Sequence, residues 1–160
     1  MTTARKIVDL PDLVACVDRA RDQGRCIALA NGLFDILHVG HLRYLEGASL
    51  QGDLLVVAVN SDISARKLKG PSRPIVAERE RAELVAGFDC VDYVTIFSEA
   101  TVEGVLRALR PDVHCKGTDY SEESVPEAGI ARALGIRIAI VGDPKDHATR
   151  DLIQRIRSDP

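Results

Sequence analysis

The sequence lacks any long apolar run, and no stretch approaches the roughly 20 consecutive apolar residues that span a bilayer. It also lacks the apolar segment of a signal peptide near its start, where the chain reads MTTARKIVDLPDL. We therefore expect no membrane partner and a cytoplasmic location.

An excess of positive charge is missing as well, because the formal net charge is -3. Nucleic acids and anionic membranes are bound through basic patches, so this charge balance argues against either as the main partner. A small anionic ligand is compatible with the sequence, since a local cationic pocket can form inside an acidic protein.

Closely spaced cysteine pairs are absent too. The four cysteines are widely separated and form no CxxC pair: Cys16, Cys26, Cys90 and Cys115. Three of them lie in or beside apolar runs. We predict that they act as small buried hydrophobic residues rather than as a zinc site or a disulfide framework.

What is present is the composition of an ordinary globular protein, with 46% hydrophobic and 28% charged residues in a chain of 160. This length suits one domain with a full hydrophobic core. We expect a single domain over 1–160, with a helical lead-in over 1–24 and the core of the domain over 25–157.

Strand-like and helix-like segments alternate along the chain. The run Leu-Leu-Val-Val-Ala-Val within 53–60 is continuously apolar, which is typical of parallel strands covered on both faces. Strands are predicted over 26–30, 53–60, 91–96, 113–116 and 136–141, and helices over 12–23, 39–50, 78–88, 101–109, 122–134 and 149–157. This order predicts an α/β fold with a single Rossmann-like, doubly wound parallel sheet.

Polar residues concentrate where the predicted strands end, over 31–41, 60–73, 116–120 and 142–150. Ligands of open α/β sheets bind at the carboxyl ends of the strands. The stretch over 68–74 is rich in glycine and proline, and we interpret it as a mobile loop at the site rather than a domain boundary.

Two histidines, His38 and His41, lie three residues apart at the start of a predicted helix. This spacing places them on one helix face, and a helix N-terminus favours phosphate. Gly40 would allow a close approach of a ligand, and Asn31-Gly32 permits a sharp turn after the strand. From the residues alone, two histidines unrelated to a ligand are an equal alternative. A zinc site is less favoured because a third ligand at metal spacing is missing.

The segment Asn-Gly-Leu-Phe-Asp-Ile-Leu-His-Val-Gly-His over 31–41 resembles the GxFDxxHxGH motif of cytidylyltransferase-like nucleotidyltransferases. Ile36 stands where members acting on nicotinate or pantetheine phosphates carry proline. The chain is more similar to the branch of glycerol-3-phosphate cytidylyltransferases and heptose 1-phosphate adenylyltransferases. The segments VAVNSD (57–62), LKGPSRP (68–74), Glu80-Arg81 and KGTDY (116–120) resemble the heptose type in the same order, and the likeness extends over 25–156.

This resemblance implies direct, in-line attack of an acceptor phosphate on the α-phosphorus of a nucleoside triphosphate, with Mg²⁺ accompanying the triphosphate and no assigned protein ligand to the metal. A nucleophilic histidine is a less favoured alternative. The implied catalytic residues are His38, His41 and Lys69, for which Lys67 is a nearby rival. The implied nucleotide-binding residues are Asn31, Gly32, Leu33, Phe34, Asp35, Gly40, Lys116, Gly117, Thr149 and Arg150. The implied acceptor-binding residues are Asn60, Asp62, Arg81 and Asp119. For Arg81 a structural role is an alternative, and for Asp35 either an orienting hydrogen bond or a structural cap.

The sequence departs from the family pattern near its last helix. The family motif Ile-Ser-Thr-Thr is replaced by His147-Ala148-Thr149-Arg150, which puts the phosphate-binding geometry of that segment in doubt. Arg150 offers a charged, bidentate contact in exchange for the missing hydroxyls. A milder difference is Leu33, where the heptose type usually has cysteine.

Three functions are weighed from the sequence. The first is transfer of AMP from ATP to a heptose 1-phosphate, giving ADP-heptose and pyrophosphate. The second is a cytidylyltransferase acting on glycerol 3-phosphate or another polyol phosphate. The third is a nucleotide-binding regulatory module without catalysis. The resemblance is also compatible with a homodimer, although no segment of the sequence identifies an interface.

Overall fold

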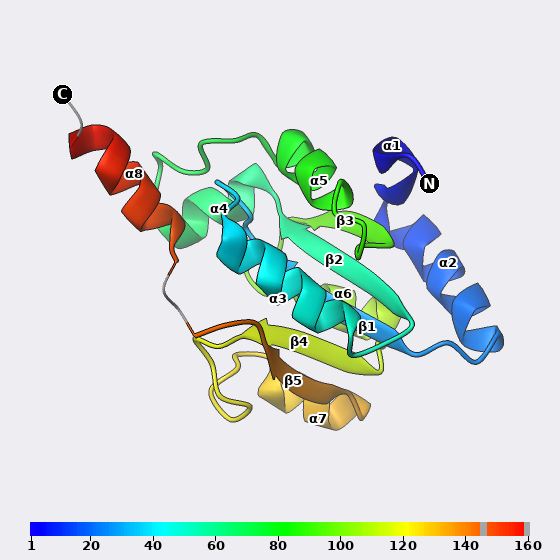
Figure 1. The fold of residues 1–160 in the computed structure, drawn as a ribbon. Helices are drawn as coiled ribbons and strands as arrows, with labels where there is room; N and C mark the ends of the chain where they lie inside the picture. The colour runs from blue at the N-terminus through cyan, green and yellow to red at the C-terminus, as the bar shows by residue number, and fades with distance from the viewer. Residues whose placement is uncertain (145–146, 159–160) are drawn as a thin grey trace.

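Five parallel strands form one sheet at the centre of the computed structural model, which describes residues 1–144 and 147–158 (Figure 1). The strand order is β3-β2-β1-β4-β5. The strands are β1 (Ile27–Gly32), β2 (Leu54–Asn60), β3 (Tyr93–Phe97), β4 (Val113–Gly117) and β5 (Arg137–Val141). The predicted α/β class and parallel sheet are confirmed, with each predicted strand found within a few residues of its expected bounds.

Helices pack on both faces of the sheet. One face packs against α3 (Val39–Ser49) and α5 (Glu78–Ala86), through buried residues such as Leu45 and Val85. The other face packs against α2 (Leu10–Asp22), α6 (Glu103–Leu109) and α7 (Ala128–Leu134), through residues such as Leu13 and Leu106. Successive strand residues alternate between these two cores, so a strand in the middle of the sheet must be apolar at every position.

Two further helices have no counterpart in the sequence prediction. The short α1 (Thr3–Lys6) precedes α2, and α4 (Asp62–Lys69) follows β2 directly. The Ser61 side chain accepts a hydrogen bond from the backbone N–H of Ser64 and caps α4. Gly70, at φ 98°, ends it in a conformation that favours glycine.

The position of α4 corrects one sequence prediction. Leu68 and Lys69 belong to the last turn of this helix, so Lys69 lies on regular structure rather than on a mobile loop. Only the part of the segment that follows Gly70 is irregular.

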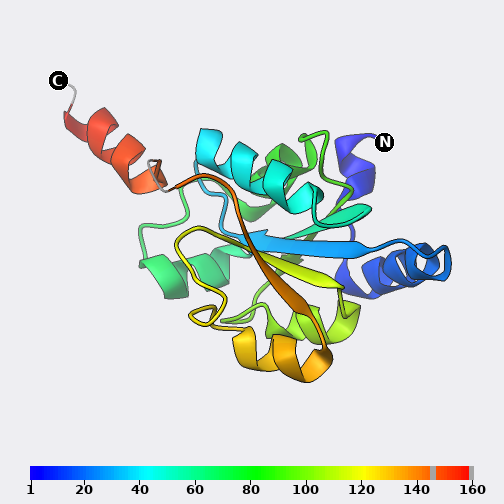
Figure 2. The same cartoon turned by 60° about the horizontal axis from the view of Figure 1, so that its bottom comes forward.

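The last helix, α8 (Thr149–Ser158), begins at the carboxyl ends of the strands and projects away from the sheet in both ribbon views (Figures 1 and 2). None of its residues is buried. Among the described residues, no helix has both the length and the apolar character that crossing a membrane requires. The four cysteines are free thiols, of which Cys115 is buried and the other three are half-buried.

Candidate active site

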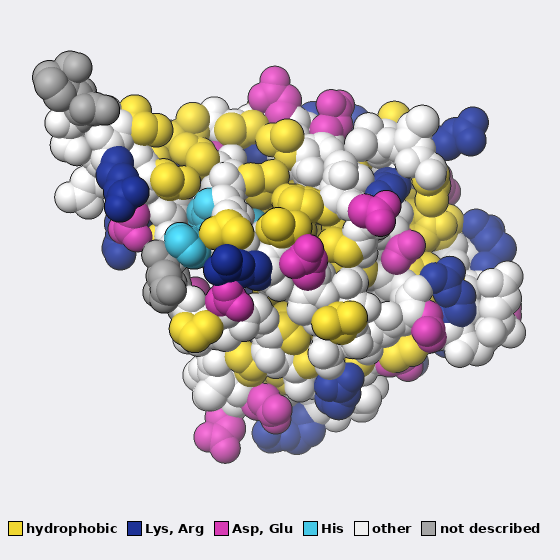
Figure 3. Space-filling view, in the orientation of Figure 1, with side chains coloured by type: hydrophobic (Ala, Val, Ile, Leu, Met, Phe, Trp, Pro, Cys, Tyr) yellow, Lys and Arg dark blue, Asp and Glu magenta, His cyan; other side chains and the backbone are white. Residues whose placement is uncertain are grey.

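A cleft of about 920 Å³ opens at the carboxyl ends of β1, β2 and β4. Every site residue predicted from the sequence lines it except Asp62 and Arg81. The predicted residues in its wall are Asn31, Gly32, Leu33, Phe34, Asp35, His38, Gly40, His41, Asn60, Lys69, Lys116, Gly117, Asp119, Thr149 and Arg150. Figure 3 shows histidine at the surface close to the point where α8 leaves the body. Segments from the whole length of the chain therefore meet at one hollow.

The two histidines of the motif form a reciprocal cap at the start of α3. His38 is the N-cap residue, and its Nδ1 accepts a hydrogen bond of 3.1 Å from the backbone N–H of Gly40. His41 Nδ1 accepts one of 3.3 Å from the backbone N–H of His38. The ring centroids are 4.0 Å apart. Because Nδ1 is an acceptor in both rings, each neutral ring carries its proton on Nε2 and presents an N–H donor there.

Both rings are held in the neutral form near pH 7. Burial, reinforced by the neighbouring His38, lowers the pKa of His41 to about 4. Burial and the neighbouring His147 lower the pKa of His38. The site thus offers two aligned hydrogen-bond donors at a helix N-terminus, a location that favours phosphate.

Gly40 and Phe34 keep this turn in shape. A Cβ atom added at Gly40 would lie 2.9 Å from atoms of the His38 ring, so a side chain there would displace the capping ring. Phe34 has a left-handed φ of 51° and is buried, with its ring centroid 5.3 Å from that of His41. The ring of Phe34 therefore packs against the ring of His41.

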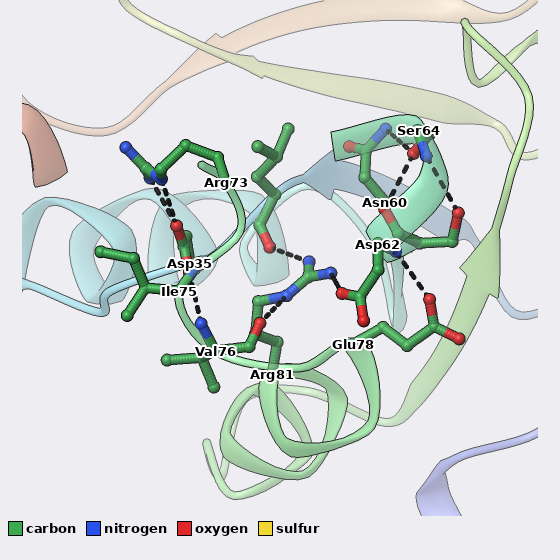
Figure 4. A network of polar contacts seen from close by, with 11 residues as sticks. Asp35, Asn60, Asp62, Ser64, Arg73, Ile75, Val76, Glu78 and Arg81 are labelled. Carbon is green, nitrogen blue, oxygen red and sulfur yellow. Dashed lines mark hydrogen bonds and ion pairs between the residues drawn. The ribbon is translucent and has the colours of Figure 1, made fainter. Parts of the chain in front are cut away.

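Asp35 anchors the segment that follows α4, as Figure 4 shows. Its buried carboxylate accepts hydrogen bonds from the backbone N–H groups of Ile75 and Val76, each 2.9 Å long. Arg73 donates to the same carboxylate from Nε and lies within 2.6 Å through Nη2 as well. Of the two roles that the sequence left open for Asp35, orientation of loop amides is the one that this geometry displays.

Arg81 of α5 and Asp62 of α4 form an ion pair between the two helices (Figure 4). Arg81 is fully buried and donates to Asp62 Oδ1 at 2.9 Å and to the carbonyl oxygens of Val76 and Leu33. The backbone N–H of Asp62 donates to Glu78. Neither residue of the pair lines the cleft, and this geometry displays the structural role that the sequence left open for Arg81, whereas contact with the acceptor stays a prediction. The guanidinium joins α4, α5 and the turn before the histidines.

A polar cluster that could not be seen in the sequence lies along β4, around His114 and Lys116. Asn31 Oδ1 lies 3.1 Å from Nε2 of the fully buried His114 and 3.4 Å from Nζ of Lys116. Lys116 Nζ also lies 3.7 Å from Glu127 and 4.8 Å from the ring centroid of Tyr120. Burial lowers the pKa of His114 to about 3, which keeps this ring neutral.

Among the cleft residues that the sequence did not single out are the polar side chains of Tyr44, Arg73 and Glu127. The Tyr44 hydroxyl donates to the carbonyl oxygen of Cys115 at 2.9 Å, and burial raises the pKa of this hydroxyl. Arg73 stands inside the quoted segment 68–74, which was a usable signal. The sequence carries no signal for Tyr44 or Glu127, because both residues reach the cleft only through the packing of α3 and α7.

The start of α8 is tied to the histidine turn. The Thr149 hydroxyl donates to the carbonyl oxygen of Ile36 at 3.0 Å, and Arg150 is exposed at the cleft. His147 lies with its ring centroid 6.3 Å from that of His38. Lys69 also lines the cleft whereas Lys67 does not, which favours Lys69 of the two rivals.

The comparisons with known proteins agree with this geometry. The family model described as Cytidylyltransferase-like matches residues 29–151. The chain is 43% identical over 156 residues to the bifunctional protein HldE of Azotobacter vinelandii, covering 98% of this chain and 33% of that protein. It is 43% identical over 136 residues to HldE of Syntrophotalea carbinolica, covering 85% of this chain and 28% of that protein. The chain thus spans about a third of the length of the curated relatives it matches.

Solved structures show the same fold. A lipopolysaccharide core biosynthesis protein from Thermoplasma volcanium is 28% identical, with a TM-score of 0.65 over 76% of this chain and 100% of that chain. Pantoate-beta-alanine ligase from Francisella tularensis is 14% identical, with a TM-score of 0.64 over 89% of this chain and 68% of that chain. The second likeness is one of fold alone.

Proposed function

Because the chain belongs to the cytidylyltransferase-like family, we propose that it transfers AMP from ATP to a heptose 1-phosphate, giving ADP-heptose and pyrophosphate. The observation that carries the proposal is the pair of neutral histidines whose Nε2–H groups are free to donate at the start of α3. The run of motifs similar to the heptose type, together with relatives named HldE, supports the choice of acceptor.

The proposed reaction is one in-line displacement. An oxygen of the acceptor phosphate forms a bond to the α-phosphorus of ATP. The bond from that phosphorus to the bridging oxygen breaks, and pyrophosphate leaves with the electron pair. The acceptor oxygen is already ionised, so the protein needs no strong general base, and rate enhancement comes from positioning and electrostatic stabilisation.

In this scheme each cleft residue has a limited task. His38 and His41 donate hydrogen bonds to phosphate oxygens whose charge grows in the transition state. Lys69 and Arg150, from α4 and α8, reach the same polyphosphate from the wall of the cleft. Asn31, with its side-chain oxygen held by His114, fixes the end of β1 beside the reacting groups.

Magnesium enters the proposal as part of the substrate. A triphosphate is ordinarily handled as its Mg²⁺ complex, and Mg²⁺ keeps much of its shell as water and phosphate oxygens. Within 1–144 and 147–158, no group of three histidine, cysteine, aspartate or glutamate side chains is arranged to hold a metal ion. The proposal therefore assigns no protein ligand to the ion, and every step above is assigned to the chain's own side chains.

The substrates also bear on location and assembly. ATP and sugar phosphates are metabolites of the cytoplasm, and we place the proposed reaction there. The homodimer with which the family resemblance is compatible stays a prediction.

Pyrophosphate release tests the proposal directly. The protein is incubated with ATP or with CTP, each combined with heptose 1-phosphate, glycerol 3-phosphate and other sugar phosphates. Release with ATP and heptose 1-phosphate above all other pairs is the expected result. Activity confined to CTP and glycerol 3-phosphate would overturn both the base and the acceptor. Triphosphate binding by calorimetry without turnover on any acceptor would instead identify a regulatory nucleotide-binding module.

A further inference from the structure

Glu127 is a nearly buried carboxylate in the wall of the cleft. The residue is 4% exposed and precedes α7, of which it is the N-cap residue. Its side chain makes no capping hydrogen bond to that helix. The ordinary structural use of an acidic residue at this position, satisfying free backbone N–H groups, is therefore not the one made here.

The pairing of this carboxylate within the protein is incomplete. Glu127 Oε2 lies 3.7 Å from Lys116 Nζ, beyond hydrogen-bond distance, and accepts no hydrogen bond from the described residues. Lys116 Nζ divides its contacts between Asn31 Oδ1 and the face of the Tyr120 ring. Burial lowers the pKa of Lys116, and the neighbouring Glu127 carboxylate acts in the opposite direction.

A buried carboxylate has about four acceptor positions, and leaving them empty carries a desolvation cost. A pair that served only the fold would close to 2.7–2.9 Å, roughly the length of a charge-assisted hydrogen bond. Here the Lys116 ammonium offsets this cost only in part, because Glu127 Oε2 accepts no hydrogen bond from the described residues. A ligand with hydrogen-bond donors would satisfy the open acceptor positions of this carboxylate.

The chemistry of that ligand follows from the charges. Phosphate oxygens are acceptors and carry negative charge, so Glu127 repels them and they belong to the histidine end of the cleft. Hydroxyl groups donate to a carboxylate and accept from an ammonium group. The Lys116–Glu127 pair therefore suits two adjacent hydroxyl groups. One hydroxyl donates a hydrogen bond to the Glu127 carboxylate, and the other accepts a hydrogen bond from Lys116 Nζ.

We propose that Glu127 and Lys116 form a subsite that binds a vicinal diol of a substrate sugar. The inference rests on the proposed function for the presence of a sugar in the cleft, and it deepens that function by naming the residues that read its hydroxyls. Two sources carry this chemistry, the ribose of the nucleotide and the ring of the acceptor sugar.

Substrates that lack one hydroxyl distinguish the two sources. Affinities are measured by calorimetry for ATP, 2′-deoxy-ATP and 3′-deoxy-ATP, and for the acceptor sugar phosphate and its deoxy analogues. The wild-type protein is compared with Glu127→Gln, which keeps the shape and loses the charge. Glu123→Gln is the matched control, because Glu123 is exposed on the same segment and lies outside the cleft wall.

Removal of one contacted hydroxyl is expected to weaken binding to the wild-type protein by about tenfold or more, the usual effect of losing a hydrogen bond to a charged group. In E127Q, removal of the same hydroxyl is expected to weaken binding by less than about threefold. In E123Q, it is expected to weaken binding as much as in the wild type. Loss confined to the ATP series assigns the diol to ribose, and loss confined to the acceptor series assigns it to the acceptor sugar.

Equal penalties for the deoxy substrates in the wild type and in E127Q would overturn the inference, and so would full affinity of the wild type for all of them. If E127Q changed only in thermal stability, and not in its affinities, Glu127 would serve only as a partner of Lys116. Should E127Q fail to fold, Glu127→Asp withdraws the oxygens by one methylene and serves the same comparison. Because calorimetry needs no turnover, failure of the proposed reaction is seen separately, as absent pyrophosphate release.

Discussion

At the scale of single residues, His38 has two tasks that a substitution can separate. Its Nδ1 caps α3, while its Nε2–H faces outward as a donor. Asparagine is among the best N-cap residues, so His38→Asn keeps the cap and loses the donor at that reach. We expect turnover to fall about 100-fold or more, with the midpoint of thermal unfolding nearly unchanged.

The control for this variant is His147→Asn. His147 lies near His38 but does not cap α3. Steady-state pyrophosphate release and thermal melting are measured on both proteins. Equal turnover of H38N and the wild type would show that the imidazole of His38 is a helix cap and nothing more.

The buried imidazole of His114 predicts a pH dependence of stability. Its pKa is about 3 in the folded protein and about 6.5 in the unfolded chain, so the unfolded state binds the extra proton between these values. The stabilisation is complete above pH 6.5 and is lost as the pH falls through this window. The loss amounts to roughly 3 kcal/mol at pH 4, with His41 adding in the same direction.

Urea unfolding of the wild type and of His114→Gln between pH 4 and 7.5 measures this contribution. The variant is expected to be less stable at pH 7.5, because it loses the ring that packs beneath Asn31, and to show a flatter dependence on pH. A slope identical to that of the wild type would mean that other groups control acid unfolding.

The sequence indicates residues such as His38 because they fall in a dense local motif. It is silent about His114 and Glu127, since each acquires its partner through tertiary structure. Asn31 and His114 are brought together by the pairing of β1 with β4, and Lys116 meets Glu127 across the long connection to α7. No local pattern encodes such contacts. Arg81 shows the opposite limit, because a recognisable motif position is fully buried and lies outside the cleft wall, which the local sequence does not reveal.

At the scale of elements, the strands were predictable and α4 was not. A strand covered on both faces must be apolar throughout, and β2 is buried at all seven positions. In α4 the buried residues are Ser64 and Ala65, so its inner face carries no apolar periodicity. The helix is held instead by its Ser61 cap and by the contact between Asp62 and Arg81.

The regular geometry of α4 gives a matched test of Lys69. This residue lines the cleft, while Lys67, two positions earlier on the same helix, does not. Lys69→Ala is expected to raise the KM for ATP about tenfold, as the loss of one charge-assisted contact to phosphate would. Lys67→Ala should leave it within twofold. Kinetics with both variants decide, and equal effects would assign Lys69 to general surface charge.

At the scale of the whole molecule, a chain of net charge -3 gathers several cations in the wall of the cleft, beside the carboxylates of Asp35, Asp119, Glu127 and Asp143. The cations in its wall are Lys69, Arg73, Lys116 and Arg150. Of these, Arg150 is exposed at the mouth, where it attracts a triphosphate through solvent. Such attraction is screened by salt, since the Debye length falls from about 10 Å at 0.1 M to 3 Å at 1 M.

We therefore expect the KM for ATP to rise several-fold between low and high potassium chloride, and to rise less in Arg150→Gln. The comparison is made by steady-state kinetics at constant pH, with Arg157→Gln, near the exposed end of α8, as the control. If R150Q keeps the salt dependence of the wild type, Arg150 does not attract ATP. The departure from the family motif at this position then has no role in nucleotide binding.

The central place of β1 in the sheet has a consequence for synthesis in the cell. β1 pairs with β2 soon after both have left the ribosome, but its other edge is completed only by β4, where Ala28 meets Val113. Until the segment Val113–Gly117 has been translated, the nascent chain presents an open strand edge whose first four residues are apolar, and such an edge is a template for pairing with other chains. The strand that leads into the histidine turn is thus also the one whose protection by chaperones during translation matters most.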